Sequence, residues 1–161
     1  MTNNSRLTVQ MDDDFVIFLI GFRINKWWKV HKWFPLIPQM AAMLKELATY
    51  RELGLLNWHT WFGRTTILVQ YWQSTEQLNA YAIAKEREHI SAWKAFNKGI
   101  GTNGDVGIWH ETYKISRQNY ECVYVNMPDF GLGKAGKLIP ALGKMANAKG
   151  RMGANNASKA K

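Results

Sequence analysis

Four histidines carry the side chains of this chain that are best suited to acid–base or metal chemistry: His31, His59, His89 and His110. An imidazole can act as a general base, bind a metal or ligate haem iron, because it loses its proton near neutral pH. His59 lies between Trp58 and Trp61, and His110 follows Trp109. His89 precedes Trp93 by four residues, which places both on one face of a helix. We expect at least one of these three histidines to border an aromatic-lined cavity; the competing interpretation is an ordinary hydrogen-bonded core residue.

Motifs for a dedicated metal site, a disulfide or a phosphate loop are absent from the sequence. The single cysteine, Cys122, excludes an intramolecular disulfide and a cysteine-rich zinc site. There is no Cys-x-x-Cys-His and no His-x-His, so we expect neither a dedicated zinc site nor non-haem iron. The glycine-rich FGLGKAG at 130–136 does not stand between a strand and a helix, as a phosphate loop would.

The composition is that of one folded domain. Of 161 residues, 47% are hydrophobic and 13% aromatic, which is too rich in large apolar groups for a disordered protein. No run approaches the roughly 18 apolar residues of a membrane-spanning helix, and the start, MTNNSRLTVQMDDD, lacks the layout of a secretory signal. We therefore expect a cytoplasmic protein without a transmembrane segment.

The positive charge of the chain is concentrated at its C-terminal end. Residues 127–161 hold seven Lys and Arg against one Asp, a net charge of +6, which leaves +3 for residues 1–126. The folded part is thus only mildly basic, and its RTTILVQYW strand lacks the signature of RNA-recognition domains. We expect no specific nucleic-acid partner.

The elements that must position the histidines follow the order β-α-β-β-α-α-β-β. Runs of β-branched and aromatic residues predict strands at 15–24, 55–62, 65–72, 106–115 and 120–126. Helical spacing predicts helices from 39 to about 53, at 74–82 and at 86–97, the second opened by Ser74 with Gln77 three residues later. This order predicts an α+β domain over 1–126, with a ferredoxin-like antiparallel sheet and helices on one face.

Two strands are apolar on both faces, and the C-terminal pattern is irregular. Because 15–24 and 65–72 alternate large groups on both sides, the face without helices needs a cover, for which we expect the sheet of a second copy in a homodimer. Residues 127–145 read as an irregular packed arm, and 146–161 as a disordered basic tail.

Several stretches together resemble a small uncharacterised bacterial family of monooxygenase-like proteins. They are GFRINKWWKVHKWFPLIPQM, YWQSTEQLNAYA, HISAWKAFN, GIWHETY and VNMPDFGLGKAG, and the resemblance spans roughly residues 13–142. It implies the dimeric α+β barrel superfamily of antibiotic-biosynthesis and haem-degrading monooxygenases. In that superfamily, a pocket between the sheet and the helices hosts cofactor-free oxygenation of electron-rich aromatics, haem or other small-molecule chemistry.

The resemblance assigns roles to residues of this chain. Cofactor-free oxygenation requires a base, for which we consider His59, His89 and His110 and favour His89, and a group such as Arg23 to hold an anionic oxygen. Haem-degrading relatives place an iron-binding histidine on the helix that corresponds to the one carrying His89, so haem is an alternative to no cofactor. The side chains expected to contact a hydrophobic or aromatic ligand are Asn57, Trp58, Trp61, Tyr81 and Trp93. A non-catalytic dimer that binds haem or another small ligand is the alternative function.

The segment 23–33, RINKWWKVHKW, mixes cations with three Trp. Such a mixture suits a membrane interface or an RNA strand. The interpretation we favour is a loop at the rim of the pocket whose Lys stems lie along apolar surface.

Overall fold

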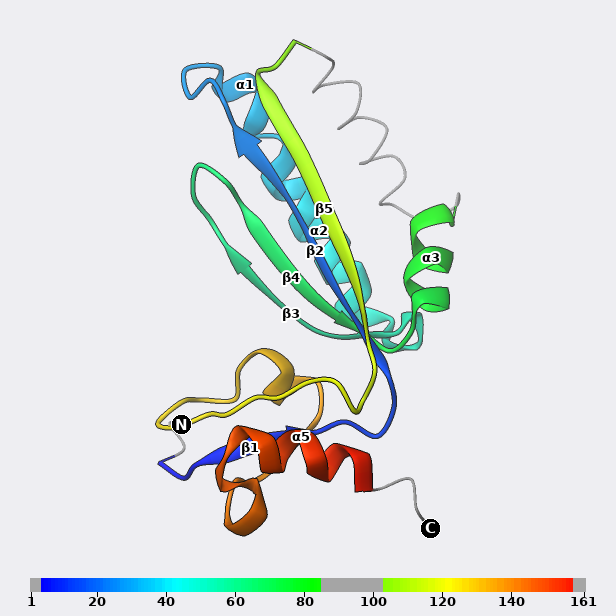
Figure 1. The fold of residues 1–161 in the computed structure, drawn as a ribbon. Helices are drawn as coiled ribbons and strands as arrows, with labels where there is room; N and C mark the ends of the chain where they lie inside the picture. The colour runs from blue at the N-terminus through cyan, green and yellow to red at the C-terminus, as the bar shows by residue number, and fades with distance from the viewer. Residues whose placement is uncertain (1–3, 85–102, 158–161) are drawn as a thin grey trace.

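The computed structural model describes residues 4–84 and 103–157 of the chain (Figure 1). Its centre is a four-stranded antiparallel sheet with the order β3-β4-β2-β5. The strands are β2 (Phe15–Ile24), β3 (Leu55–Trp61), β4 (Ile67–Trp72) and β5 (Val106–Ile115). These strands and the helices that connect them give the ferredoxin-like α+β arrangement, which confirms the fold class predicted from the sequence.

Helices α2 (Leu36–Thr49) and α3 (Thr75–Ile83) lie on one face of this sheet (Figure 1). The short α1 (Val30–Trp33) leads into α2, and the 3-10 turn η1 (Arg51–Leu53) follows it and ends at Gly54, whose φ is 92°. Helix α2 begins three residues before the predicted start and includes Pro38 in its first turn. A proline is tolerated there because the N–H that it lacks would be unpaired in any case. The predicted cap of α3 is confirmed, since the Ser74 side chain accepts a hydrogen bond from the Gln77 amide. The helix predicted at 86–97 lies outside the described residues.

The core between α2, α3 and the sheet forms because alternate residues of β2 point toward the helices. Its buried members are Val16, Phe22, Ile24, Leu36, Leu47, Leu55, Trp72, Leu78, Tyr81 and Val106. Trp72 is 1% exposed, so its truncation to Ala would cost about 3–5 kcal/mol. This packing fixes the distance between helices and sheet.

A second, two-stranded sheet pairs β1 (Leu7–Gln10) with β6 (Lys137–Pro140), and the 3-10 turn η2 (Gly131–Lys134) precedes β6. The prediction of a strand at 120–126 is wrong, because only Tyr124 forms an isolated bridge, with Leu7. The side chain of Tyr120 instead donates to the Val9 carbonyl and accepts from the Met11 amide, at 3.1 and 2.8 Å. Tyr120, Cys122 and Tyr124 therefore pack in a small core with Val9 of β1 and do not extend the main sheet.

The C-terminal segment contains the helix α5 (Ala148–Ala157), where the sequence favours disorder. The anchor is Arg151, which is 5% exposed, pairs with the Glu121 carboxylate and donates to the carbonyls of Met145 and Ala146. This ion pair joins residues thirty positions apart and therefore leaves no periodic pattern in the sequence. Because the segment is poor in apolar groups, its composition predicts disorder, although the ion pair holds it in the fold.

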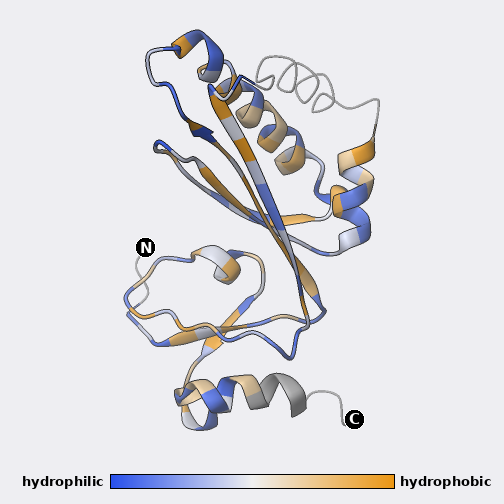
Figure 2. Cartoon of the chain, turned by 45° about the horizontal axis from the view of Figure 1, so that its top comes forward, coloured by the Kyte–Doolittle hydropathy of each residue, from blue (hydrophilic) through white to orange (hydrophobic). Residues whose placement is uncertain are grey.

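The strands of the main sheet carry hydrophobic residues along much of their length (Figure 2), and some of those on the face opposite α2 and α3 are partly exposed. The pairings Leu19 with Val69 and Val69 with His59 place these side chains on that face, and Ile67 and Tyr113 beside them are 37% and 47% exposed. Within the described residues, no helix is both long and apolar enough to span a bilayer.

Candidate functional site

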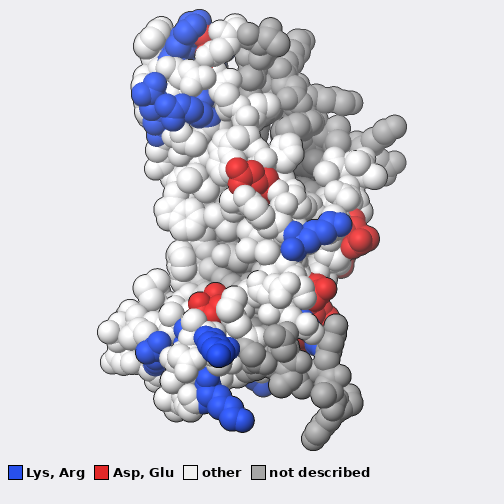
Figure 3. Space-filling view, viewed as in Figure 1, with Lys and Arg blue, Asp and Glu red and all other residues white. Residues whose placement is uncertain are grey.

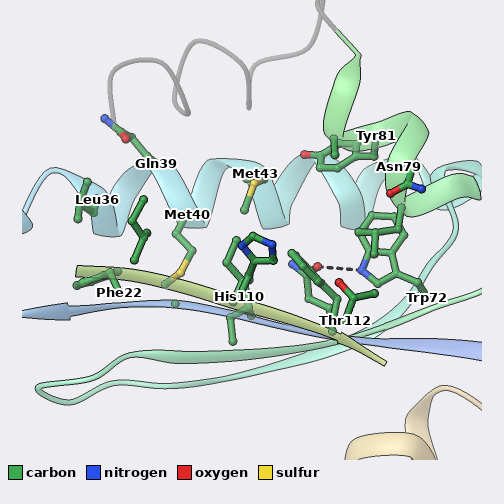
Figure 4. Close-up of a pocket in the computed structure, with 18 residues that line it drawn as sticks. Phe22, Leu36, Gln39, Met40, Met43, Trp72, Asn79, Tyr81, His110 and Thr112 are labelled. Carbon is green, nitrogen blue, oxygen red and sulfur yellow. Dashed lines mark hydrogen bonds between the residues drawn. The ribbon is translucent and has the colours of Figure 1, made fainter. Parts of the chain in front are cut away.

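A cavity of about 340 Å³ lies between the main sheet and helices α2 and α3. Its apolar wall includes Phe18, Ile20, Phe22, Leu36, Met40, Met43, Leu68, Trp72 and Ile108. In Figure 4, Met40 and Met43 project from α2 toward the sheet, and the His110 ring rises from β5 toward the helix. No Lys, Arg, Asp or Glu is among the described lining residues, and the volume falls within the range of small-molecule sites. The cavity therefore suits an uncharged, largely apolar compound.

The polar groups of the cavity include Gln70, His110 and Thr112, which share the helix-facing side of the sheet. Phe18 pairs with Gln70 on one side and with Thr112 on the other, and the next row along β2 carries His110. Strands β4 and β5 flank β2 and the two residues are offset by two positions along the strands, so the backbones carrying Gln70 and His110 lie about 12 Å apart. The two side chains can thus contact opposite ends of one compound that lies across β2.

Gln70 is the buried polar group of this site. It is 2% exposed, and the Trp72 indole Nε1 donates to its Oε1 at 2.8 Å (Figure 4). An indole nitrogen can only donate, so the atom that faces it must be the amide oxygen. The Gln70 amide nitrogen is left to present N–H donors, and a ligand oxygen is the acceptor that suits them.

His110 borders the same cavity from β5, with its ring centroid 5.9 Å from that of Phe18. Its side chain is exposed, and no hydrogen bond joins its imidazole to any other described residue. An imidazole in this position is available to take or give a proton at a bound compound.

His59 lies on the opposite face of the sheet, because the odd-numbered residues of β3 that follow the bulge at Leu55 and Asn57 point away from the helices. Its Nε2 accepts the Gly131 amide hydrogen at 2.9 Å, and its ring stacks on Phe130 with centroids 4.2 Å apart. Asn57 donates to the Gly131 carbonyl at 2.9 Å. Burial, and secondarily the charge of Lys134, lowers the pKa of His59, in agreement with a neutral ring that accepts a hydrogen bond. His59 and Asn57 hold the η2 turn against the sheet and do not border the cavity.

The other residues singled out from the sequence are divided among several places. Tyr81 lines the cavity and donates its hydroxyl to Glu46. Trp58 packs against the core, whereas Trp61 is exposed beside Phe130 on the far face. Arg23 is exposed, bonds to the Thr65 hydroxyl at 2.8 Å and is not among the cavity residues.

His89 and Trp93 lie outside the described residues, so the structure does not place them. Gln70 and Thr112 were missed by the sequence reasoning. A signal for Gln70 existed, because it occupies the inward position between Leu68 and Trp72 in an otherwise apolar strand.

Comparison with known proteins gives a family match. The sequence pattern of the monooxygenase af470-like family matches residues 15–132. The chain is 33% identical over 133 residues to monooxygenase af470 of Aspergillus fumigatus, covering 74% of this chain and 45% of that protein. The chain thus spans about half the length of this curated relative.

One of two similar solved structures supports the fold. A crystal structure of the aldoxime dehydratase OxdRE in complex with butyraldoxime superposes with a TM-score of 0.65 at 13% identity, covering 82% of this chain and 39% of that one. A conserved protein of unknown function from Bacteroides thetaiotaomicron, titled a possible oxidoreductase, has a TM-score of 0.43 at 15% identity and covers 63% of this chain and 98% of that one. At such low identity, the first likeness supports the fold alone.

Proposed function

Because the chain belongs to the monooxygenase af470-like family, we propose that it is a small-molecule monooxygenase that oxidises a hydrophobic, aromatic compound in the cavity between its sheet and helices. The observation that carries this proposal is the pairing of a buried amide donor, Gln70, with an available imidazole, His110, across one cavity whose described lining is largely apolar and holds no charged side chain. The sequence match covers under half of the curated relative, so the proposed substrate class rests on the geometry of the cavity.

The geometry suits an aromatic ketone with an activated CH2 group. His110 removes a proton from that carbon, and the negative charge that develops on the conjugated ketone oxygen is stabilised by the N–H donors of Gln70. The electrons of the carbanion then reduce dioxygen. In the balanced reaction, one CH2 group and one O2 give one C=O group and one water, so the substrate supplies all four electrons and no reductant is needed.

Haem fits the described part of the cavity less well than an uncharged aromatic compound does. Haem carries two propionates in addition to an iron that needs an axial ligand. The described lining offers one imidazole, that of His110, and no cation to pair with a propionate. The haem alternative drawn from the sequence depended on His89, which lies outside the described residues, and no step of the proposal involves a cofactor.

We also propose that the protein is a homodimer through the sheet face that lacks helices. The support is the set of partly exposed apolar side chains on that face, among them Leu19, Ile67 and Val69. A second sheet laid on this face would remove them from water, and each Å² of apolar surface so buried contributes about 25 cal/mol.

The test uses anthrone, a three-ring ketone with an activated CH2 opposite its carbonyl, as the probe. We expect the dialysed wild-type protein to convert it to anthraquinone with consumption of dioxygen. His110→Ala should lose at least about a hundredfold in kcat, as expected for removal of a general base, with little change in melting temperature because the side chain is exposed. His59→Ala should retain turnover. Binding of anthrone without turnover would instead support the non-catalytic alternative, and a Soret band that survives dialysis would support haem.

A further inference from the structure

The loop and helical turn at residues 26–34, here called the cationic aromatic loop, expose large apolar side chains at one end of the molecule. Trp28 is 75% exposed, Phe34 57%, Val30 48% and Trp27 46%. Trp33, in the same turn, packs inward against the core near Leu36. Trp33 therefore already fills the inward position, and the four exposed side chains are not among the core residues of the described part of the chain.

The cationic aromatic loop is also uniformly basic. The loop itself contains Lys26, Lys29, Lys32 and His31, and the longer segment 15–45 around it contains no Asp or Glu. Figure 3 shows Lys and Arg side chains gathered at the end of the molecule that carries α1. The acid beside these lysines, Asp105, has a side chain only 2% exposed and lies beneath them. The surface presented to solvent thus combines exposed aromatic groups with positive charge.

Asp105 holds this loop in one conformation. Its carboxylate forms ion pairs with the amines of Lys26 and Lys29 at 2.7 Å each, and its carbonyl accepts hydrogen bonds from the Asn25 and Lys26 amides. The Trp33 indole donates to the Trp27 carbonyl at 3.1 Å. Because the loop is already ordered, binding through Trp28 and its neighbours costs little conformational entropy.

We propose that the cationic aromatic loop binds the surface of an anionic lipid bilayer. Tryptophan and phenylalanine beside lysines are the composition of segments that lie at the boundary between headgroups and acyl chains, and each cation near an anionic surface contributes about 1 kcal/mol. Single-stranded RNA is the less suitable partner, because Val30 offers no ring on which a base could stack. The loop leads directly into α2, whose first residue, Leu36, lines the cavity. A docked molecule would bring this end of the cavity close to the bilayer, where apolar compounds accumulate.

The experiment measures sedimentation of the full-length protein with vesicles of phosphatidylcholine alone and of equal parts phosphatidylcholine and phosphatidylglycerol. We expect binding to the mixed vesicles that weakens with added salt, and little binding to phosphatidylcholine. Trp28→Ser combined with Phe34→Ser should weaken binding by at least about tenfold, and Lys32→Glu by about tenfold or more. Leu142→Ser, which alters a residue 71% exposed outside the loop, should bind like the wild type. Melting temperature and anthrone turnover should be unchanged in all variants.

Three results would overturn the proposal. The first is wild-type protein that stays in the supernatant with both vesicle types. The second is a double variant that binds as well as the wild type. The third is a double variant whose oligomeric state falls in sedimentation velocity, which would assign the loop to a contact between copies. Tighter binding of a polyuridine strand than of the mixed vesicles, lost in the double variant, would assign it to RNA. None of these results bears on the cavity chemistry, which is measured separately by turnover.

Discussion

The hydrogen bond from the Trp72 indole to the Gln70 side chain, both of which line the cavity, can be tested with two substitutions. In Gln70→Leu, the indole N–H of Trp72 keeps its buried position but loses its acceptor. An unpaired buried donor costs about 1–3 kcal/mol, and 1 kcal/mol corresponds to about 2–4 °C in a domain of this size. We therefore expect Gln70→Leu to lower the melting temperature by about 2–12 °C.

The second substitution, Trp72→Phe, removes the donor itself. If the hydrogen bond carries the effect, the double variant with Gln70→Leu should lose less stability than the sum of the two single variants, with a coupling of about 0.5–3 kcal/mol. Chemical denaturation of the four proteins measures this coupling. A coupling of zero would mean that the amide oxygen of Gln70 is not held by the indole, and the assignment of free N–H donors to the cavity would then fail.

Ligand binding gives the same substitution a second readout. Anthrone and dihydroanthracene have nearly the same shape, but only anthrone carries a carbonyl oxygen. Loss of one neutral hydrogen bond should weaken anthrone binding to Gln70→Leu by about two- to tenfold, and binding of dihydroanthracene should be unchanged or tighter. The binding of both compounds is measured by fluorescence quenching or calorimetry. Equal weakening for both would show that Gln70 shapes the cavity and does not contact a ligand oxygen.

Three further predictions concern the elements around the site. Burial lowers the pKa of His59, so its hydrogen bond from Gly131 is complete above the ordinary histidine value of about 6.5 and is lost as the pH falls through the lowered folded value. The protection of the Gly131 amide from hydrogen exchange, relative to its intrinsic rate at each pH, should therefore fall in acid, and a protection that does not change with pH would contradict this. Arg151→Met should destabilise the fold by about 1–3 kcal/mol in urea unfolding, because partly exposed Glu121 and two carbonyls lose their partner; an unchanged midpoint would mean that α5 is not anchored. Sedimentation should show a dimer at micromolar concentration, with Val69→Lys shifting it to monomer, and a stable wild-type monomer would refute the proposed interface.

The sequence specified most of the sheet and one of its helix caps, because these depend on local chemistry. Strand 15–24 and the Ser74 cap could be read from β-branched runs and from residue spacing. The pairing of β1 with β6 could not be read, since four-residue strands more than a hundred residues apart leave no periodic pattern. The ion pair of Arg151 with Glu121 was hidden for the same reason.

The candidate site, too, could be predicted from the sequence only in part. An aromatic neighbourhood could be predicted for both His59 and His110, but the face of the sheet to which each ring points depends on strand register. The bulge between Leu55 and Asn57 sets that register in β3 and turns His59 away from the helices. In β5, unbroken pairing with β2 places His110 on the cavity side. The assignment of Gln70 required the hydrogen bond to Trp72, which only the folded chain shows.

Isotopic labelling of the product oxygen tests the proposed monooxygenase activity most directly. Anthrone is incubated with the dialysed full-length protein under dioxygen labelled with heavy oxygen, and the anthraquinone formed is analysed by mass spectrometry. The proposed mechanism predicts one labelled atom in each product molecule, with the label absent when only the water is labelled, and a rate of product formation that falls to background in His110→Ala. Product formed at the same rate by the wild type and by His110→Ala, or product whose new oxygen comes from water, would contradict it.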